Sequence, residues 1–190
     1  MRKAVLLAAL LIVALVSARA EASASFANRA LGLDFAGFKI FGDSNLVQYG
    51  IVPIGLQGAI YLDNGFEAVL RVQLMLFYQS NFVGSTGGGP GFIWGGGGQV
   101  GARYLFLEEN IRPYAELHLA VLGIGRSEST GTEATSAPAV FVGPGVALGV
   151  DFFVADSISL GARGFFDFFL TLNSPPRTAL GGAITVATYF

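Results

Sequence analysis

The chain lacks cysteine altogether and is poor in charge. Its 190 residues include one histidine, 11 lysines and arginines, and 13 aspartates and glutamates, for a formal net charge of −2. Without cysteine the chain forms no disulfide and offers no N-terminal cysteine for lipid attachment. The small, scattered charge provides no basic surface for nucleic acid, so we expect no nucleic-acid partner.

A long hydrophobic run is also missing from most of the chain. Hydrophobic residues make up 53% of the sequence and the mean hydropathy is +0.60, which is high for a soluble domain. Yet beyond Val16 no uninterrupted apolar run reaches the roughly 20 residues that cross a bilayer as a helix. A chain this apolar without such runs suits a membrane β-barrel, in which apolar and polar residues alternate along each strand.

The N-terminus has the layout of a secretory signal peptide. Arg2 and Lys3 precede an apolar run over residues 4–16, and small residues with A-x-A cleavage candidates follow at 18–20 and 20–22. The run is about 13 residues long, too short to span a bilayer. We therefore expect a signal peptide at 1–22, cleaved near 20–22, and one barrel domain at 23–190. A retained N-terminal anchor is the alternative.

Alternation of apolar and other residues predicts eight strands. Each is about 11 to 15 residues long, more than the 9–11 that a tilted strand needs to cross a bilayer and far more than the five or six usual in soluble proteins. The expected ranges are 31–41, 51–62, 66–78, 92–106, 112–124, 140–153, 157–170 and 180–190. We predict an all-β fold, an eight-stranded antiparallel up-and-down transmembrane β-barrel.

The connections alternate between short and long. Asp63-Asn64-Gly65 is a hairpin signal, because Asn-Gly favours the positive φ angles of a type I′ turn, and residues 108–110 and 155–156 are also short. Long connections cover 42–50, 79–91, 126–138 and 171–178. With an even strand number, both termini lie on the short-turn side. We expect an extracellular partner to use loops 79–91 and 126–138, since loops on rigid scaffolds carry recognition.

The last strand ends the chain on an aromatic residue. One of its faces consists of Ile184, Val186, Thr188 and Phe190. This ending is similar to the C-terminal insertion signal of bacterial outer-membrane barrels, and the chain from 23 onward resembles small barrels of the OmpA transmembrane-domain and OmpX type. The resemblance implies an outer-membrane location in Gram-negative bacteria, surrounding outer-membrane lipid, recognition of the C-terminal strand by the barrel insertion machinery, and periplasmic termini.

The polar residues collect on one face of the strands. Three arginines and five carboxylates share it, so we expect mixed-sign pairs inside a lumen that an eight-stranded barrel can fill with side chains. The predicted lumen network is Asp34, Glu67, Arg71, Arg103, Glu116, His118, Asp151, Arg163 and Asp167. Aromatic residues near strand ends, with Trp94, Tyr104 and Tyr189 among them, suggest girdles at the membrane interfaces.

The single histidine is the obvious candidate for chemistry. His118 and Glu116 point to the same face, which fits a metal or acid–base site, but one histidine makes a poor metal site. Barrels that deacylate lipid A use a histidine followed two positions later by serine, where this chain has Ala120. Gly95–Gly98 lacks the strand–loop–helix context of a phosphate-binding loop. We therefore expect no catalytic residue, no metal and no cofactor.

The sequence favours a structural or surface-interaction role, with a plugged polar lumen and four extracellular loops. Three alternatives remain open at this stage. The barrel could be a small pore or an OmpW-like transporter of small or apolar molecules. It could be a lipid-modifying outer-membrane enzyme, or a secreted lipocalin-like barrel that never enters a membrane.

Overall fold

A computed structural model describes residues 28–42, 48–79, 91–107, 110–124, 139–170 and 176–190. The expected signal peptide at 1–22 lies outside these residues. So do loop 126–138 and all of loop 79–91 except Gln79 and Gly91, which belong to the flanking strands.

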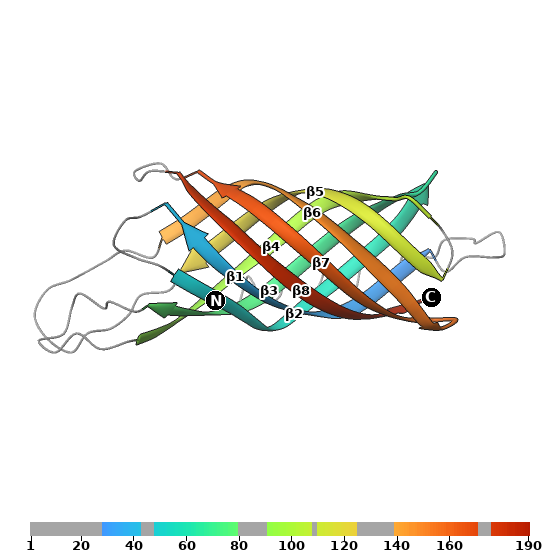
Figure 1. Cartoon of the computed structure of the whole chain (residues 1–190), viewed down its shortest axis with the longest axis horizontal. Coiled ribbons are helices and arrows are strands. Elements are labelled where there is room, and N and C mark those ends of the chain that lie inside the picture. Colours follow the sequence, from blue (N-terminus) through green and yellow to red (C-terminus); the bar gives the residue numbers. More distant parts are fainter. Residues whose placement is uncertain (1–27, 43–47, 80–90, 108–109, 125–138, 171–175) are drawn as a thin grey trace, which may run out of the picture.

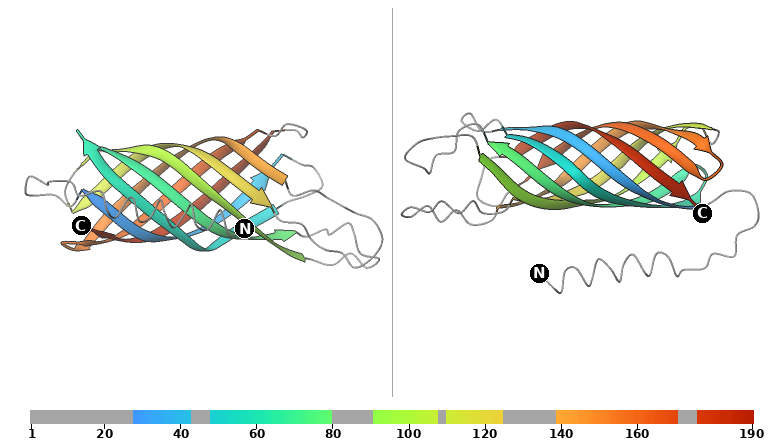
Figure 2. Two further views of the ribbon diagram at one scale, coloured as in Figure 1. Left: turned by 180° about the vertical axis from the view of Figure 1, so that it is seen from behind. Right: turned by 90° about the horizontal axis from the view of Figure 1, so that it is seen from below.

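Eight antiparallel strands close into one barrel (Figures 1 and 2). Each strand pairs with the next in the sequence, and the last pairs with the first, as predicted for an up-and-down barrel. Closure leaves no unpaired sheet edge, which satisfies the backbone in lipid. The strands are β1 Arg29–Phe41, β2 Gln48–Asp63, β3 Phe66–Gln79, β4 Gly91–Leu105, β5 Ile111–Ile124, β6 Ala139–Ala155, β7 Ile158–Phe169 and β8 Arg177–Tyr189.

The two ends of the barrel differ. The strand ends that flank residues 43–47, 80–90, 125–138 and 171–175 all lie at one end, which we call the long-loop end, and the C-terminus lies at the other, the short-turn end (Figure 1). At the short-turn end, Asn64 and Gly65 have φ angles of 52° and 82°. Both are positive, as a type I′ turn requires, and Asn64 N donates to Asp63 Oδ1 at 2.8 Å. The predicted hairpin is confirmed.

Strand ends are where the prediction was least accurate. β8 begins at Arg177 rather than at 180, because Arg177 to Ala179 pair with Phe169 to Asp167 of β7. β2 and β6 reach 16 and 17 residues, longer than expected. A strand ends where its hydrogen bonds to the neighbouring strand end. The alternation of apolar and polar residues along one strand does not show where that is.

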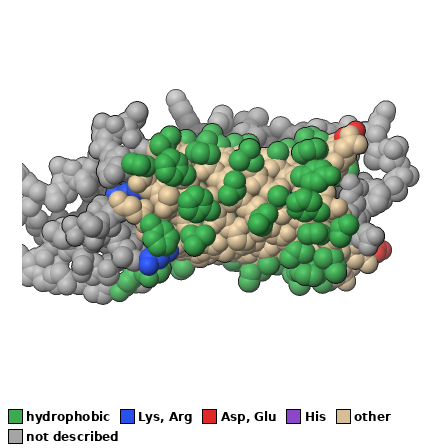
Figure 3. All heavy atoms as spheres, turned by 45° about the horizontal axis from the view of Figure 1, so that its top comes forward, with side chains coloured by type: hydrophobic (Ala, Val, Ile, Leu, Met, Phe, Trp, Pro, Cys, Tyr) green, Lys and Arg blue, Asp and Glu red, His purple; other side chains and the backbone are tan. Residues whose placement is uncertain are grey.

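Side chains alternate between the interior and the outer wall along the strands, except that a bulge in β2 between Ile51 and Ile54 shifts the alternation by one residue. In β7, for example, buried and exposed positions alternate along the strand. The outward series carries large apolar side chains, which cover the wall in Figure 3. On that face, Lys and Arg side chains appear only at the long-loop end and Asp and Glu only at the short-turn end. In the part of the chain that the structure describes, there is no helix long and apolar enough to cross a membrane.

Candidate functional site

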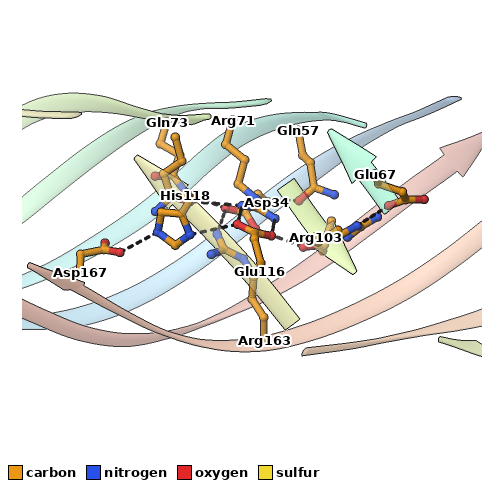
Figure 4. A network of polar contacts seen from close by, with 12 residues as sticks. Asp34, Gln57, Glu67, Arg71, Gln73, Arg103, Glu116, His118, Arg163 and Asp167 are labelled. Atoms are coloured by element: carbon orange, nitrogen blue, oxygen red, sulfur yellow. Dashed lines mark hydrogen bonds and ion pairs between the residues drawn. The ribbon is translucent and has the colours of Figure 1, made fainter. Parts of the chain in front are cut away.

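The structure places all nine residues of the predicted lumen network inside the barrel. None is more than 4% exposed. They come from six of the eight strands, β1 and β3 to β7, and their side chains point toward one another inside the barrel (Figure 4). Buried charges require partners, because an isolated charge in an apolar interior costs several kcal/mol.

Arg71 is the most fully bonded of these residues. Its Nη1 and Nη2 bind Glu116 Oε1 and Oε2 at 2.5 and 2.8 Å, a two-pronged arginine–carboxylate pair. Nε donates to Gln57 Oε1 at 2.8 Å and Nη1 also reaches Gln99 Oε1 at 3.4 Å. Gln57, Arg71 and Gln99 are direct neighbours on β2, β3 and β4, so the register itself assembles this group, and the bonds to Glu116 link it to β5, the strand beyond β4.

Asp34 is the centre of a second group. Its Oδ2 accepts from Gln73 Nε2 at 2.7 Å and from Arg163 Nη2 at 3.0 Å, and its Oδ1 accepts from Thr185 Oγ1 at 3.1 Å. Asp34 and Gln73 sit on β1 and β3 and meet across Gly55 of β2, which pairs with both. A Cβ at Gly55 would lie 3.2 Å from Asp34 Cβ and from Gln73 Cγ. Glycine on the middle strand therefore gives these two side chains room to meet.

His118 is held between two carboxylates. Its Nε2 lies 2.7 Å from Asp167 Oδ1 and its Nδ1 lies 3.1 Å from Glu116 Oε1. His118 and Asp167 again meet across a glycine, Gly145 of β6, which pairs with both. Ala120, two residues further along β5, is also buried. His118 and Ala120 therefore both face the lumen, and neither faces the outer wall. No cluster of His, Cys, Asp and Glu in the described residues could hold a metal ion.

Arg103 organises the network toward the short-turn end. Its Nε donates to Glu67, its Nη1 lies 3.3 Å from Asp151 Oδ2, and its Nη2 donates to the hydroxyl of Tyr189 at 3.2 Å. Tyr189 is only 5% exposed. Its expected place in an outer aromatic girdle is wrong, because the alternation of β8 turns odd-numbered side chains inward there.

An aromatic stack lies beside Tyr189. The rings of Phe153 and Tyr189 are 4.8 Å apart, and the guanidinium carbon of Arg112 lies 4.2 Å from the centre of the Phe153 ring. A cation over an aromatic face is attracted by the ring quadrupole. The lumen is therefore filled by large side chains at the short-turn end as well.

The half of the lumen nearer the long-loop end is apolar, which the sequence reading missed. Its buried cluster includes Phe38, Met75, Phe77, Phe165 and Phe169. Rings occupy the space that interior glycines leave open. A Cβ at Gly181 would lie 2.5 Å from Phe165 Cζ, and one at Gly95 would lie 2.6 Å from Phe77 Cε2.

A small cavity separates the apolar rings from the polar network. Its volume is about 20 Å³, and Gln73, Gln99 and Asp167 supply its polar lining. A space of this size holds about one water molecule and no organic ligand.

The outer wall carries amphipathic aromatic residues at both ends. Tyr78 and Trp94 are exposed on β3 and β4 at the long-loop end. Phe66, Tyr104 and Phe106 pack together at the short-turn end, with ring centres 5.0 and 5.5 Å apart. Two such belts, with apolar side chains between them, are typical of barrels that cross a bilayer.

The C-terminal residues lie where the strand pattern places them. Ile184, Val186, Thr188 and Phe190 all face outward. β8 closes the barrel against β1, and Phe190 N donates to Arg29 O at 2.9 Å. Thr188 stands between Leu31 of β1 and Ile158 of β7 on the outer wall. Recognition of this strand by insertion machinery remains a prediction.

Comparison of sequences identifies no relative. No protein-family model matches the chain, and no curated protein does. The resemblance to known barrels therefore depends on architecture.

Comparison of structures finds small outer-membrane barrels. Neisserial surface protein A has a TM-score of 0.54 at 15% identity, over 88% of this chain and all of that one. Ail of Yersinia pestis, in complex with the heparin analogue sucrose octasulfate, gives 0.54 at 13% identity over 87% and 99%. The outer membrane protein OprG from Pseudomonas aeruginosa gives 0.54 at 9% identity over 87% and 97%. The chain has the fold of the small eight-stranded outer-membrane β-barrels.

Proposed function

We propose that this chain is an integral protein of the bacterial outer membrane with a structural or surface-recognition role and a lumen closed to solutes. The observation that carries the proposal is the pairing of an apolar outer wall with an interior occupied by ion pairs and rings. Soluble proteins bury apolar side chains and expose charged ones, whereas this barrel buries ion pairs and exposes apolar side chains on its outer wall.

The spacing of the aromatic belts fits a membrane. Trp94 and Tyr104 stand near opposite ends of β4 and both face outward. About ten residues separate them, which corresponds to about 25 Å along the barrel axis at ~3.3 Å per residue and a tilt of ~40°. This matches the height of the apolar band of outer-membrane barrels. A lipocalin-like soluble barrel would not need an apolar wall of this height.

The closed interior favours recognition over conduction. The Arg71–Glu116 and Arg103–Glu67 pairs, the Asp34 group and the apolar rings leave a cavity of only about 20 Å³ at the level of Gln99. Contacts with an external partner then fall to the long-loop end, through loops 79–91 and 126–138. The structure of Ail with sucrose octasulfate is a precedent for a barrel of this fold with an external ligand.

Cell fractionation tests the proposal. We expect the protein in the outer-membrane fraction, with faster gel migration before heating than after, as a folded barrel resists detergent. Epitope tags inserted in loop 126–138 should be accessible on intact cells, whereas a tag at the C-terminus should not. Recovery of the protein in the soluble periplasmic fraction would overturn the proposal.

Passage of small apolar molecules is a second candidate function. The apolar half-lumen at the long-loop end favours it, because Phe38, Phe77 and Phe165 offer an apolar entry. The candidate requires these rings to move, since the cavity between them and the polar network is small. Phe38→Ala and Phe165→Ala should then raise uptake of a small apolar dye into proteoliposomes. Uptake equal to that of protein-free vesicles in the wild type and in both variants would exclude it.

We propose further that the barrel is not an enzyme. His118 faces the lumen with each ring nitrogen near a carboxylate, and Ala120 stands where lipid A-deacylating barrels have serine. Lipid A from cells that carry the wild-type chain and from cells that carry His118→Ala should therefore be identical by mass spectrometry. A change in acylation that depends on His118 would contradict this.

A further inference from the structure

The seam between β1 and β8 differs from the other strand pairs of the barrel. The other seven pairs join strands that follow one another in the sequence, whereas this pair joins the first strand to the last. Bringing together two segments that are far apart in the chain costs more conformational entropy than closing a short turn. Side-chain contacts that cross the seam therefore have more to offset than contacts within a hairpin.

Asp34 of β1 has such contacts. It is the direct cross-strand partner of Thr185 of β8, whose hydroxyl donates to Asp34 Oδ1 at 3.1 Å. Arg163 of β7, the strand beyond β8, donates from Nη2 to Asp34 Oδ2 at 3.0 Å (Figure 4). On the other side of β1, Gln73 of β3 donates to the same oxygen at 2.7 Å. One carboxylate thus joins the last two strands to the first and the third.

The bonds of Arg71 and His118 do not cross this seam. Arg71 of β3 bonds to side chains of β2, β4 and β5, and His118 of β5 bonds to Asp167 of β7. Each of these contacts joins strands that are also linked through consecutive strand pairs, so it does not require β1 to lie beside β8. The bonds of Asp34 to β7 and β8 do require it.

Separation of the two strands would deprive two buried charges of their partners. Asp34 is fully buried and Arg163 is 4% exposed. Arg163 Nε and Nη1 have no hydrogen-bond partner among the described residues, so Arg163 depends on its ion pair with Asp34. Without Arg163, Asp34 would keep only the neutral amide of Gln73. Because a buried charge without its partner is strongly destabilising, these contacts oppose opening of the seam.

We propose that Asp34 is a clasp that locks the seam between β1 and β8. Its contacts with Thr185 and Arg163 form when the last strand meets the first, and they must break before the two strands can part. Side chains inside the lumen therefore hold the barrel shut in addition to the backbone hydrogen bonds. All three residues are buried in the interior, so the clasp does not depend on what surrounds the outer wall, and its test is separate from that of the proposed function.

The backbone amides of β1 provide a residue-specific measure of seam opening. Hydrogen-bonded pairs alternate along antiparallel strands. Arg29 and Phe190 donate to each other across the seam at 3.2 and 2.9 Å, so the amides of Leu31 and Leu33 also bond to β8. The amide of Gly32 bonds to β2 instead. Hydrogen exchange at Leu31 and Leu33 therefore reports separation from β8, and exchange at Gly32 is an internal reference.

NMR hydrogen exchange on the refolded full chain in detergent micelles tests the clasp. Thr185→Val removes the hydroxyl donor and keeps the shape of the side chain. We expect it to speed exchange at Leu31 and Leu33 about tenfold, because a hydrogen bond to a charged group is lost, and to leave exchange at Gly32 unchanged. Thr185→Ser is the matched control, since it keeps the hydroxyl, and it should exchange as the wild type does.

A second variant removes the charge. Asp34→Asn eliminates the ion pair with Arg163 and should speed exchange at Leu31 and Leu33 more than Thr185→Val does. The two Thr185 variants decide the question whether or not Asp34→Asn refolds. Exchange at Leu31 and Leu33 that is equal in Thr185→Val and the wild type, with heat-dependent gel migration intact, would overturn the inference. An equal acceleration at Gly32 would also overturn it, because Thr185 would then stabilise the whole barrel and not the seam.

Discussion

The contact between His118 and Asp167 crosses directly over Gly145. His118 Nε2 and Asp167 Oδ1 are 2.7 Å apart, and Gly145 is the cross-strand neighbour of both residues. The two side chains belong to β5 and β7, and the strand between them has no side chain at this point. The same arrangement recurs where Asp34 and Gln73 meet over Gly55. Interior glycines thus allow polar side chains to join alternate strands.

A methyl group at Gly145 should break this contact. Its Cβ would overlap both Asp167 Oδ1 and His118 Nε2, so Gly145→Ala should lower the free energy of unfolding by about 1–3 kcal/mol. Urea unfolding in lipid vesicles, followed by gel migration, measures this. The matched control is Gly164→Ala on the outer wall, where the nearest atom would be 3.9 Å away. Equal stability of the two variants would contradict the role given to Gly145.

The Arg71–Glu116 pair should behave as a coupled unit. Arg71→Met leaves the Glu116 carboxylate buried without its two-pronged partner, and should cost about 3–5 kcal/mol. Arg71→Met combined with Glu116→Leu should cost less than Arg71→Met alone, because no unpaired charge remains. A double-mutant cycle from urea unfolding gives the coupling energy. Strictly additive losses would show that the pair contributes little.

The polar network shows how far the sequence can be interpreted. Alternation alone assigned Arg71, Arg103 and Glu116 to one face, because the side chains of a strand repeat with a period of two. It could not say that Arg71 binds Glu116 and that Arg103 binds Glu67. That choice depends on the register between strands: Glu67 and Arg103 are partners on the adjacent strands β3 and β4, and Arg71 of β3 reaches Glu116 of β5 past β4.

The same substitution should lower stability at one of two neighbouring glycines of β8 and leave it almost unchanged at the other. Gly181 faces the interior, where a Cβ would lie 2.5 Å from Phe165 Cζ and 2.6 Å from Phe38 Cβ. Gly182 faces outward and would meet only Arg163 O at 3.6 Å. Gly181→Ala should therefore destabilise the barrel by about 1–3 kcal/mol, whereas Gly182→Ala should change stability by less than about 0.5 kcal/mol. Thermal unfolding of both variants measures the difference in stability, and equal stabilities would contradict this prediction.

The apolar half of the lumen was hidden for a related reason. Phe38, Phe77 and Phe165 share a face with the buried arginines, yet an isolated strand does not show how much room lies opposite each ring. The room comes from Gly50, Gly95 and Gly181 on adjacent strands. Once the register is known, an interior glycine next to an aromatic residue on the adjacent strand predicts that the ring fills the lumen at that level.

Depth in the membrane should set the cost of a charge on the outer wall. Leu148, near the middle of β6, is 69% exposed, and Val154, near the short-turn end of the same strand, is 61% exposed. Leu148→Arg should cost about 2–4 kcal/mol in a bilayer and Val154→Arg about 0–1 kcal/mol. Reversible unfolding from phospholipid vesicles compares them. Equal costs at the two positions would argue against a membrane around this wall.

Single-channel recording in planar bilayers tests the closed lumen most directly. The ion pairs of Arg71 and Arg103 and the apolar rings of the long-loop half occupy the lumen, and the cavity between the rings and the polar network has a volume of about 20 Å³. The reconstituted chain should therefore show no conductance steps above the bare bilayer, and its heat-dependent gel migration should prove that it is folded. Stable, reproducible steps from the folded wild-type chain would contradict a lumen closed by this network.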